Sequence, residues 1–163
     1  MDTLFHDDET KVHPKSGLVI NGLSLEKQAF LMTIAQAEGA TYTTMYGGSQ
    51  FTDFSKHPHQ CIPINLPGYE GMCSDAAGKY QFLSSTWALL GLPDFSPANQ
   101  DRGAVMLIQE TNAFNLLEQG DIAGAFCAVG AIWASLPCNA YGQNPKSLGL
   151  RVAMYGDNLQ HLK

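Results

Sequence analysis

The hydrophobic pattern of the chain begins with a helix over residues 25–38. Apolar side chains recur there at the three- and four-residue spacing of one helix face: Phe30, Leu31, Ile34 and Ala35. Ser24 precedes this run as a plausible N-cap, and Gly39 follows it as a natural stop. The pattern therefore predicts an amphipathic helix whose last turn carries Glu38.

The pattern changes after this helix and then becomes helical again. Residues 40–75 are rich in Thr, Tyr, Gly, Ser and Pro and contain short extended pieces, which are typical of a small β-region. From residue 76 onward we expect helices near 79–90, 97–111, 112–119, 121–134 and 146–155. Gly91 and Pro93 would end the first of these, and Ser96 with Pro97 would begin the second. The predicted class is α+β: a helical body, a small β-lobe and a ligand cleft between them.

Length and composition indicate one domain without a membrane span. The 163 residues suit a single domain over 23–163, preceded by a poorly anchored extension at residues 1–22. No run of about 18 apolar residues exists that could form a transmembrane helix. The polar, acidic N-terminus lacks the features of a Sec signal peptide. The net charge of −6 argues against nucleic acid as a partner, because no basic patch is present to replace phosphate counterions.

Four cysteines allow three disulfide connectivities. Their proximity in sequence favours Cys61–Cys73 and Cys127–Cys138, which would suit an oxidising compartment such as the periplasm. Four reduced thiols in a cytosolic protein are the alternative. A zinc site built from His57, His59, Cys61 and Cys73 is a further alternative, although these residues lack the CxxC-like spacing of structural zinc sites. We expect neither a metal nor a cofactor.

Glu38 is the leading candidate for chemistry. A carboxylate near the negative end of a helix dipole is disfavoured, so its pKa is expected to be raised. A glutamate with a raised pKa is what general-acid catalysis of glycoside cleavage needs. The alternative is a solvated glutamate at a helix end.

The string Asp-Ala-Ala-Gly-Lys-Tyr-Gln-Phe at residues 75–82 is a second candidate. Gly78 would permit close approach of the backbone, Tyr80 offers a flat ring for a sugar face, and Gln81 supplies an amide for hydroxyl and N-acetyl groups. A buried helix start with the tyrosine in the core would explain the string equally well.

Together with four other strings, these two segments resemble the lambda-type phage endolysins, which are peptidoglycan lytic transglycosylases of the lysozyme-like superfamily. The resemblance covers residues 25–155, and its strings occur in the family's order: AEG at 37–39, GSQFTDFSKHP at 48–58, AGKYQ at 77–81, DFSPANQD at 94–101, IWASLP at 132–137 and YGQ at 141–143. The chain departs from the family pattern at Ala40, which is inserted before Thr41 and leaves the role of Thr41 open.

The resemblance implies that Glu38 protonates the bond between N-acetylmuramic acid and N-acetylglucosamine. Glu38 would then act as the base while the muramoyl C6 hydroxyl closes on C1, giving a 1,6-anhydro product without water. Peptidoglycan strands would be the partner, bound by Gly78, Tyr80, Gln81, Tyr141 and Gln143.

Other residues have two interpretations. Asp53 could be a second carboxylate or the stabiliser of a turn. Trp133 could belong to the core or form a platform on which sugars stack. His57 is expected to form hydrogen bonds within a loop, whereas Asp101 and Glu110 are expected at solvated helix positions.

Three alternatives to a transglycosylase stay open. They are a hydrolysing muramidase delivered as an antibacterial toxin, a catalytically silent glycan-binding module, and a zinc-stabilised interaction domain. The lytic activities imply synthesis in the cytoplasm and action in the periplasm, without insertion into the membrane. Delivery would then depend on a holin or an injection machine, and an inhibitor or immunity protein is a possible partner.

Overall fold

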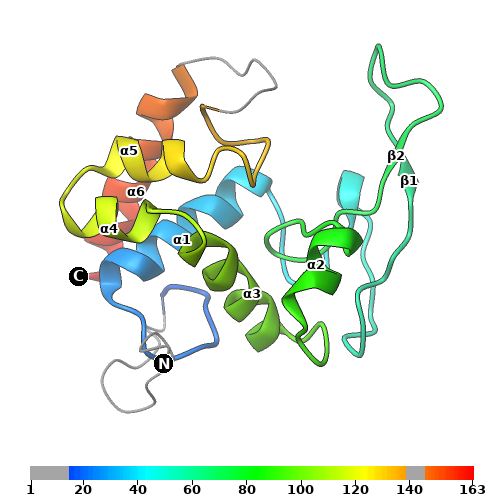
Figure 1. Ribbon diagram of the computed structural model, residues 1–163, viewed down its shortest axis with the longest axis horizontal. Helices are drawn as coiled ribbons and strands as arrows, with labels where there is room; N and C mark the ends of the chain where they lie inside the picture. The colour runs from blue at the N-terminus through cyan, green and yellow to red at the C-terminus, as the bar shows by residue number, and fades with distance from the viewer. Residues whose placement is uncertain (1–14, 139–145) are drawn as a thin grey trace. The chain divides into compact units, whose positions relative to one another are not determined.

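The computed structural model describes residues 15–138 and 146–163. The chain divides into two compact units. The helical unit comprises residues 1–37 and 104–163, and the β unit comprises residues 38–103 (Figure 1). The units are joined through two helices, α1 (Leu25–Glu38) and α3 (Pro97–Gln109). The mixture of helices with one small antiparallel sheet confirms the predicted α+β class.

Helix α1 begins and ends as the sequence predicts. The Ser24 hydroxyl oxygen accepts a hydrogen bond from the backbone N–H of Lys27 at 3.2 Å, and Gly39 adopts a left-handed φ of 65°. The expected amphipathic character is wrong, because every residue from Gln28 to Ala35 is buried. The helix is therefore central rather than superficial.

Aromatic packing holds the helical unit together. Phe30 of α1 lies 6.3 Å from Phe114 of α4 (Ala113–Glu118) and 4.6 Å from Phe126 of α5 (Ile122–Ala128), measured between ring centroids. Helix α6 (Lys146–Leu162) adds a polar tie, since the amide of Asn158 donates to the Thr33 hydroxyl at 2.9 Å. Helix α5 is shorter than expected and α6 is longer.

The segment before α1 is anchored where the structure describes it. Leu18 and Ile20 are only 4% and 3% exposed, and Leu23 is also buried. Leu18 and Ile20 therefore anchor this part of the expected extension in the core, whereas Val19 between them is exposed. The boundary between an extension and a domain at residue 22 stays a prediction.

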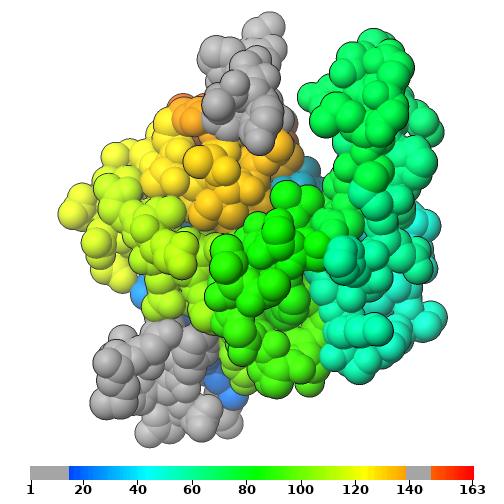
Figure 2. Space-filling model, turned by 45° about the vertical axis from the view of Figure 1, so that its right-hand side comes forward, coloured from blue at the N-terminus to red at the C-terminus, as the bar shows by residue number. Residues whose placement is uncertain are grey.

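The β unit contains a short hairpin and a turn in place of a predicted helical segment. Strand β1 (Ile62–Pro63) pairs antiparallel with β2 (Cys73–Ser74), and the hairpin extends away from the rest of this unit (Figure 2). Helix α2 spans Ser84–Leu90 and ends at Gly91, with a left-handed φ of 67°. Residues 78–82 form a turn rather than the start of this helix, because Ala77 and Phe82 pair with each other.

Rings also form the core of the β unit, around Phe95. Its centroid lies 4.7 Å from that of Trp87, 5.7 Å from that of Phe51 and 5.0 Å from that of His57. His57 is buried, its Nε2 lies 2.8 Å from the carbonyl oxygen of Phe82, and its Nδ1 accepts from the backbone N–H of His59. His57 therefore stabilises a loop, as expected, with a neutral ring protonated at Nε2.

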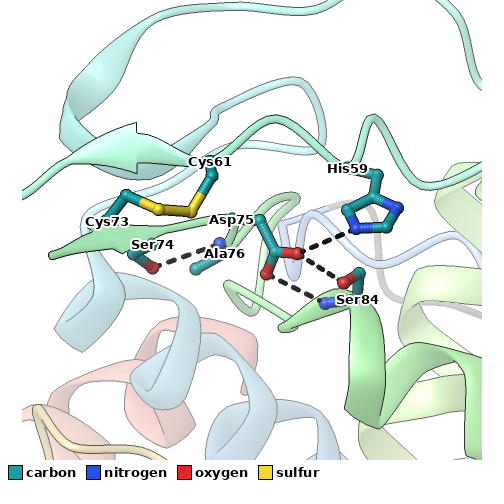
Figure 3. Close-up of a disulfide and its surroundings, with 7 residues drawn as sticks. All are labelled: His59, Cys61, Cys73, Ser74, Asp75, Ala76 and Ser84. Atoms are coloured by element: carbon teal, nitrogen blue, oxygen red, sulfur yellow. Dashed lines mark hydrogen bonds and ion pairs between the residues drawn. A yellow bond between two sulfur atoms is a disulfide. The ribbon is translucent and has the colours of Figure 1, made fainter.

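Both disulfides favoured by sequence proximity are present. Cys61–Cys73 closes the base of the hairpin (Figure 3), and Cys127–Cys138 joins α5 to the chain that follows it. The first disulfide occupies the two thiols that the zinc alternative required, so that alternative is wrong. Within residues 15–138 and 146–163, no helix is long and apolar enough to cross a membrane.

Reduction of the disulfides should lower the melting temperature without unfolding the protein. The paired cysteines are 12 and 11 residues apart, and a loop of this size contributes about 3 kcal/mol in the chain-entropy model. Thermal unfolding of the oxidised protein, the reduced protein and the two paired Cys→Ser variants measures each contribution. Four titratable thiols in the oxidised protein would contradict the pairing.

Acid should destabilise the fold through His57. Burial lowers the pKa of His57 in the folded state, so the unfolded chain binds this proton first as the pH falls below about 6.5. The stabilisation from the neutral ring is therefore present above that pH and is lost below it. The free energy of unfolding, measured in urea at pH 7 and pH 5, should fall less for His57→Gln than for the wild type. The exposed His161, changed to Gln, is the matched control, and equal pH dependence in all three proteins would contradict this role.

Candidate functional site

Glu38 is the last residue of α1 and the first residue of the β unit. Its side chain is half-buried, and the left-handed Gly39 turns the chain sharply after it. Glu38 therefore lies at the C-terminal end of α1, which is the negative end of the helix dipole. The position suits an acid that releases a proton to a substrate.

The segment that follows Glu38 is held by threonine hydroxyls. The Thr44 hydroxyl oxygen accepts from the backbone N–H of Thr41 at 3.0 Å and lies 2.9 Å from the Thr41 hydroxyl. The Thr43 hydroxyl donates to the Gln50 amide oxygen. Thr41 therefore serves this turn despite the insertion of Ala40, and residues 41–44 form a defined turn just beyond the acid.

The Gly-Lys-Tyr-Gln turn fixes the same segment from its other side. The carbonyl oxygen of Thr44 accepts from the backbone N–H of Gly78 at 2.8 Å and from the Gln81 amide at 3.0 Å. The Gln81 amide also donates to the Gly78 carbonyl oxygen, at 2.9 Å. Gln81 is half-buried, and its amide oxygen takes part in neither bond. The Gln81 side chain therefore stabilises the backbone of residues near Glu38.

Gly78 is buried and makes room for protein atoms rather than for a sugar. A Cβ atom at this position would lie 2.4 Å from the Gln100 amide oxygen and 2.9 Å from the Phe95 ring. The Gln100 amide in turn donates to the Tyr42 carbonyl oxygen at 3.0 Å. The expected contact between Gly78 and substrate is therefore wrong, because the close approach is made by the protein itself.

Tyr80 is fully buried, at 0% exposure, so it cannot present a ring face to a sugar. Its hydroxyl donates to Asp101 at 2.7 Å, and the Tyr42 hydroxyl lies 2.9 Å from both carboxylate oxygens of Asp101. Asp101 is itself fully buried, so its expected solvated position is also wrong. Burial, reinforced by the charge of Asp101, raises the pKa of both tyrosines and keeps them as donors.

Lys79 completes this buried network. Its ammonium group lies 4.5 Å from the centroid of the Tyr42 ring and 3.4 Å from the Tyr42 hydroxyl. Burial lowers the pKa of Lys79, and the nearby carboxylate of Asp101 opposes that shift. The two hydroxyls and the ammonium therefore gather around one carboxylate, which compensates for its burial.

A sequence signal for Asp101 existed. Asp101 lies on the same helix face as buried apolar residues three, four and seven positions later: Ala104, Val105 and Ile108. A polar residue on such a face indicates a buried group with dedicated partners. The partners themselves, 21 and 59 residues away in sequence, were not deducible from the pattern.

Asp53 is exposed and stabilises a turn. Its carboxylate accepts from the backbone N–H of Ser55 at 2.8 Å, and hydrogen bonds from Ser55 lower its pKa. This is the turn-forming interpretation of the residue. A carboxylate that stays ionised does not supply a proton, so the general acid is not Asp53.

Asp75 lies beside a serine and a histidine without forming a hydrolytic triad (Figure 3). It accepts hydrogen bonds from the backbone N–H and the hydroxyl of Ser84, and it lies 3.7 Å from His59 Nε2. Burial acts to raise the pKa of Asp75, but the bonds from Ser84 and the neighbouring histidines outweigh it and lower the pKa. The serine donates to the carboxylate and not to the histidine, so it is not activated as a nucleophile.

The remaining predicted sugar contacts are Trp133, Tyr141 and Gln143. Trp133 is 3% exposed and belongs to the core, so the stacking platform is wrong. Tyr141 and Gln143 lie outside the described residues. Glu110 is exposed, as expected for a solvated position. In the part of the chain that the structure describes, no three His, Cys, Asp or Glu side chains are grouped to hold a metal ion.

Comparison with known proteins places the chain in a family. Residues 28–161 match the Endolysin family. The chain is 38% identical to the endolysin of Escherichia phage lambda over 132 residues, covering 72% of this chain and 81% of that protein. It is 41% identical to the endolysin of Escherichia phage P2 over 110 residues, covering 64% and 67%.

A structural comparison agrees. The fold matches bacteriophage lambda lysozyme in complex with a chitohexasaccharide, with a TM-score of 0.74 and 34% identity, covering 83% of this chain and 95% of that one. A second structure of the lambda lysozyme gives the same TM-score. The lysozyme-like fold and the sequence match lead to one conclusion: the chain belongs to the endolysin family of peptidoglycan-degrading enzymes.

Proposed function

We propose that this endolysin is a lytic transglycosylase in which Glu38 is the only catalytic carboxyl group. The observation that carries the proposal is the half-buried Glu38 at the end of α1, in a family that degrades peptidoglycan. The resemblance to a lysozyme that binds a chitohexasaccharide supports a β-1,4-linked amino-sugar strand as the substrate.

The proposed reaction uses one carboxyl group twice, first as an acid and then as a base. Glu38 protonates the glycosidic oxygen between N-acetylmuramic acid and N-acetylglucosamine, and the C1–O bond breaks to leave positive charge at C1. The C6 hydroxyl oxygen of the same muramoyl residue then bonds to C1, and its proton returns to Glu38. The products are a 1,6-anhydromuramoyl end and a free N-acetylglucosamine end, and no water is consumed.

The structural roles of the other acidic residues in the β unit support a mechanism with one carboxyl group. The four aspartates there all serve the fold: Asp53 and Asp94 in turns, Asp75 at the start of α2, and Asp101 between two tyrosines. Glu70 is exposed on the hairpin. A hydrolysing muramidase needs a second carboxylate to activate water or to stabilise an intermediate, and each of these aspartates has a structural role that explains its presence.

Glu38→Gln should abolish murein cleavage and leave the fold intact. The amide keeps the shape of the side chain but cannot deliver a proton, and loss of a general acid costs about 10²–10⁴-fold in rate. Turbidity loss of purified murein measures activity, and thermal unfolding with a murein-binding assay controls for folding and substrate recognition. Substantial activity in a pure sample would remove Glu38 from the role of acid.

The same variant tests the proposed site of action, which is the periplasm. Export of the wild type by a periplasmic signal peptide should lyse Gram-negative cells, whereas cytoplasmic expression should be tolerated and exported Glu38→Gln should be harmless. The disulfides fit this oxidising compartment. Delivery of the natural chain by a holin or an injection machine belongs to the same proposal.

The products distinguish the two reactions. A transglycosylase leaves 1,6-anhydromuramic ends, which are one water lighter than the reducing ends left by a hydrolase. Mass spectrometry of digested murein should show anhydro ends for the wild type and also for Asp53→Asn, because Asp53 takes no part in bond cleavage. Reducing ends alone would assign the chain to the hydrolysing muramidases.

A further inference from the structure

A polar cavity in the β unit lies among residues that the proposed reaction does not use. It has a volume of about 420 Å³, and the residues that line it include Met45, Phe51, Asp53 and Lys56. Met45 and Phe51 are buried and give the cavity a fixed apolar wall. Phe51 is held in turn by its contacts with Phe54 and Phe95, so this wall belongs to the aromatic core.

Two exposed groups of opposite charge stand on the same cavity. The hydrogen bonds from Ser55 fix the Asp53 carboxylate in place and lower its pKa, so it is ionised at neutral pH. Lys56 lies three residues later and carries an ammonium group. Among residues 15–138 and 146–163, no ion pair joins Asp53 to Lys56. The Lys56 charge still acts on Asp53, since it contributes to the lowered pKa of that carboxylate. Both side chains are exposed, so a ligand in the cavity can contact either charge.

This combination suits a ligand that carries both an ammonium and a carboxylate group. Glycan strands of peptidoglycan present hydroxyl and acetamido groups, which offer no ammonium to Asp53. The peptides attached to the muramoyl residues do carry free amines and free carboxylates. Exposed ion pairs contribute little affinity each, but two charges of opposite sign at fixed positions select for a zwitterion and fix its orientation.

The cavity follows Glu38 closely along the chain. Met45 is the seventh residue after Glu38, so the two are at most about 25 Å apart even along an extended chain. The left-handed Gly39 and the turn at residues 41–44 make the true separation shorter. A stem peptide of four residues spans about 14 Å when extended, so the proposal requires the cavity to lie within about that distance of the muramoyl residue that carries the peptide.

We propose that this cavity binds the stem peptide of peptidoglycan, with Asp53 receiving a free peptide ammonium and Lys56 a free peptide carboxylate. The proposal rests on the proposed function, because it presumes that the substrate is a peptidoglycan strand. It adds a preference for strands that still carry their peptides.

Steady-state kinetics on two substrates tests the proposal. The substrates are soluble murein strands with their peptides and the same strands after removal of the peptides by an amidase. Asp53→Asn and Lys56→Gln should each raise KM about two- to five-fold on the first substrate, the range expected for an exposed charge contact. Neither variant should change KM on the second substrate, and kcat should stay near that of the wild type on both. Glu110→Gln and Lys163→Gln, at exposed positions of the helical unit, are the matched controls.

Chemical acetylation of the peptide amines separates the two contacts. On acetylated murein the wild type should have the KM of Asp53→Asn, and Asp53→Asn should show no further rise, whereas Lys56→Gln should still raise KM. Equal effects on strands with and without peptides, or no effect beyond that of the controls, would overturn the peptide site. Loss of anhydro products on both substrates would instead contradict the transglycosylase, so the two failures are distinguishable.

Discussion

The β unit depends on one buried charge, the carboxylate of Asp101. Two phenol hydroxyls, from Tyr42 and Tyr80, donate to it at 2.7–2.9 Å, and the Lys79 ammonium lies against the first phenol. A carboxylate removed from water is tolerated only when such donors replace its solvation, and loss of a partner from a buried charge typically costs about 3–5 kcal/mol. Asp101 therefore ties the start of α3 to the segment after Glu38 and to the turn at residues 78–81.

This arrangement changes the meaning of the Gly-Lys-Tyr-Gln string. The string itself allowed either a sugar-binding surface or a tyrosine buried in the core. The structure shows the buried tyrosine: Gly78 accommodates Gln100, the Tyr80 hydroxyl donates to a buried carboxylate, and the Gln81 amide donates to the Thr44 carbonyl oxygen. These side chains position the backbone that leaves Glu38, and a defined backbone is what places a catalytic acid within a few tenths of an ångström of its target. The string therefore stabilises the backbone next to Glu38.

Local rules account for what the sequence predicted well. The N-cap at Ser24, the left-handed Gly39 and Gly91, and two disulfides between neighbouring cysteines each depend on a few adjacent residues. The failures depend on distant partners. The predicted helix at 79–90 begins only at Ser84, because pairing of Ala77 with Phe82 favours a turn. The burial of Asp101 and Trp133 likewise follows from tertiary packing. Tertiary packing cannot be deduced from the polarity of an aspartate or the aromatic ring of a tryptophan. The position of Glu38 at a helix end is a local feature, so the sequence could predict it. The geometry around Glu38 depends on residues distant in sequence, so the sequence could not predict it.

The distribution of acidic groups links the fold to the proposed chemistry. The protein has an excess of acidic residues, with a net charge of −6. The aspartates of the β unit nevertheless have structural roles in turns, at a helix start and beside a buried tyrosine pair. Hydrogen bonds or burial among donors hold such groups in their ionised form, which suits them to support structure or to bind a cation. Glu38 differs because it ends a helix, where the backbone dipole opposes a negative charge. The proposed one-acid reaction needs a single carboxyl group, and Glu38 is the acidic residue of the β unit that lies at a helix end. Asp53 is ionised and exposed to solvent, so its charge is available for binding a ligand cation rather than for catalysis.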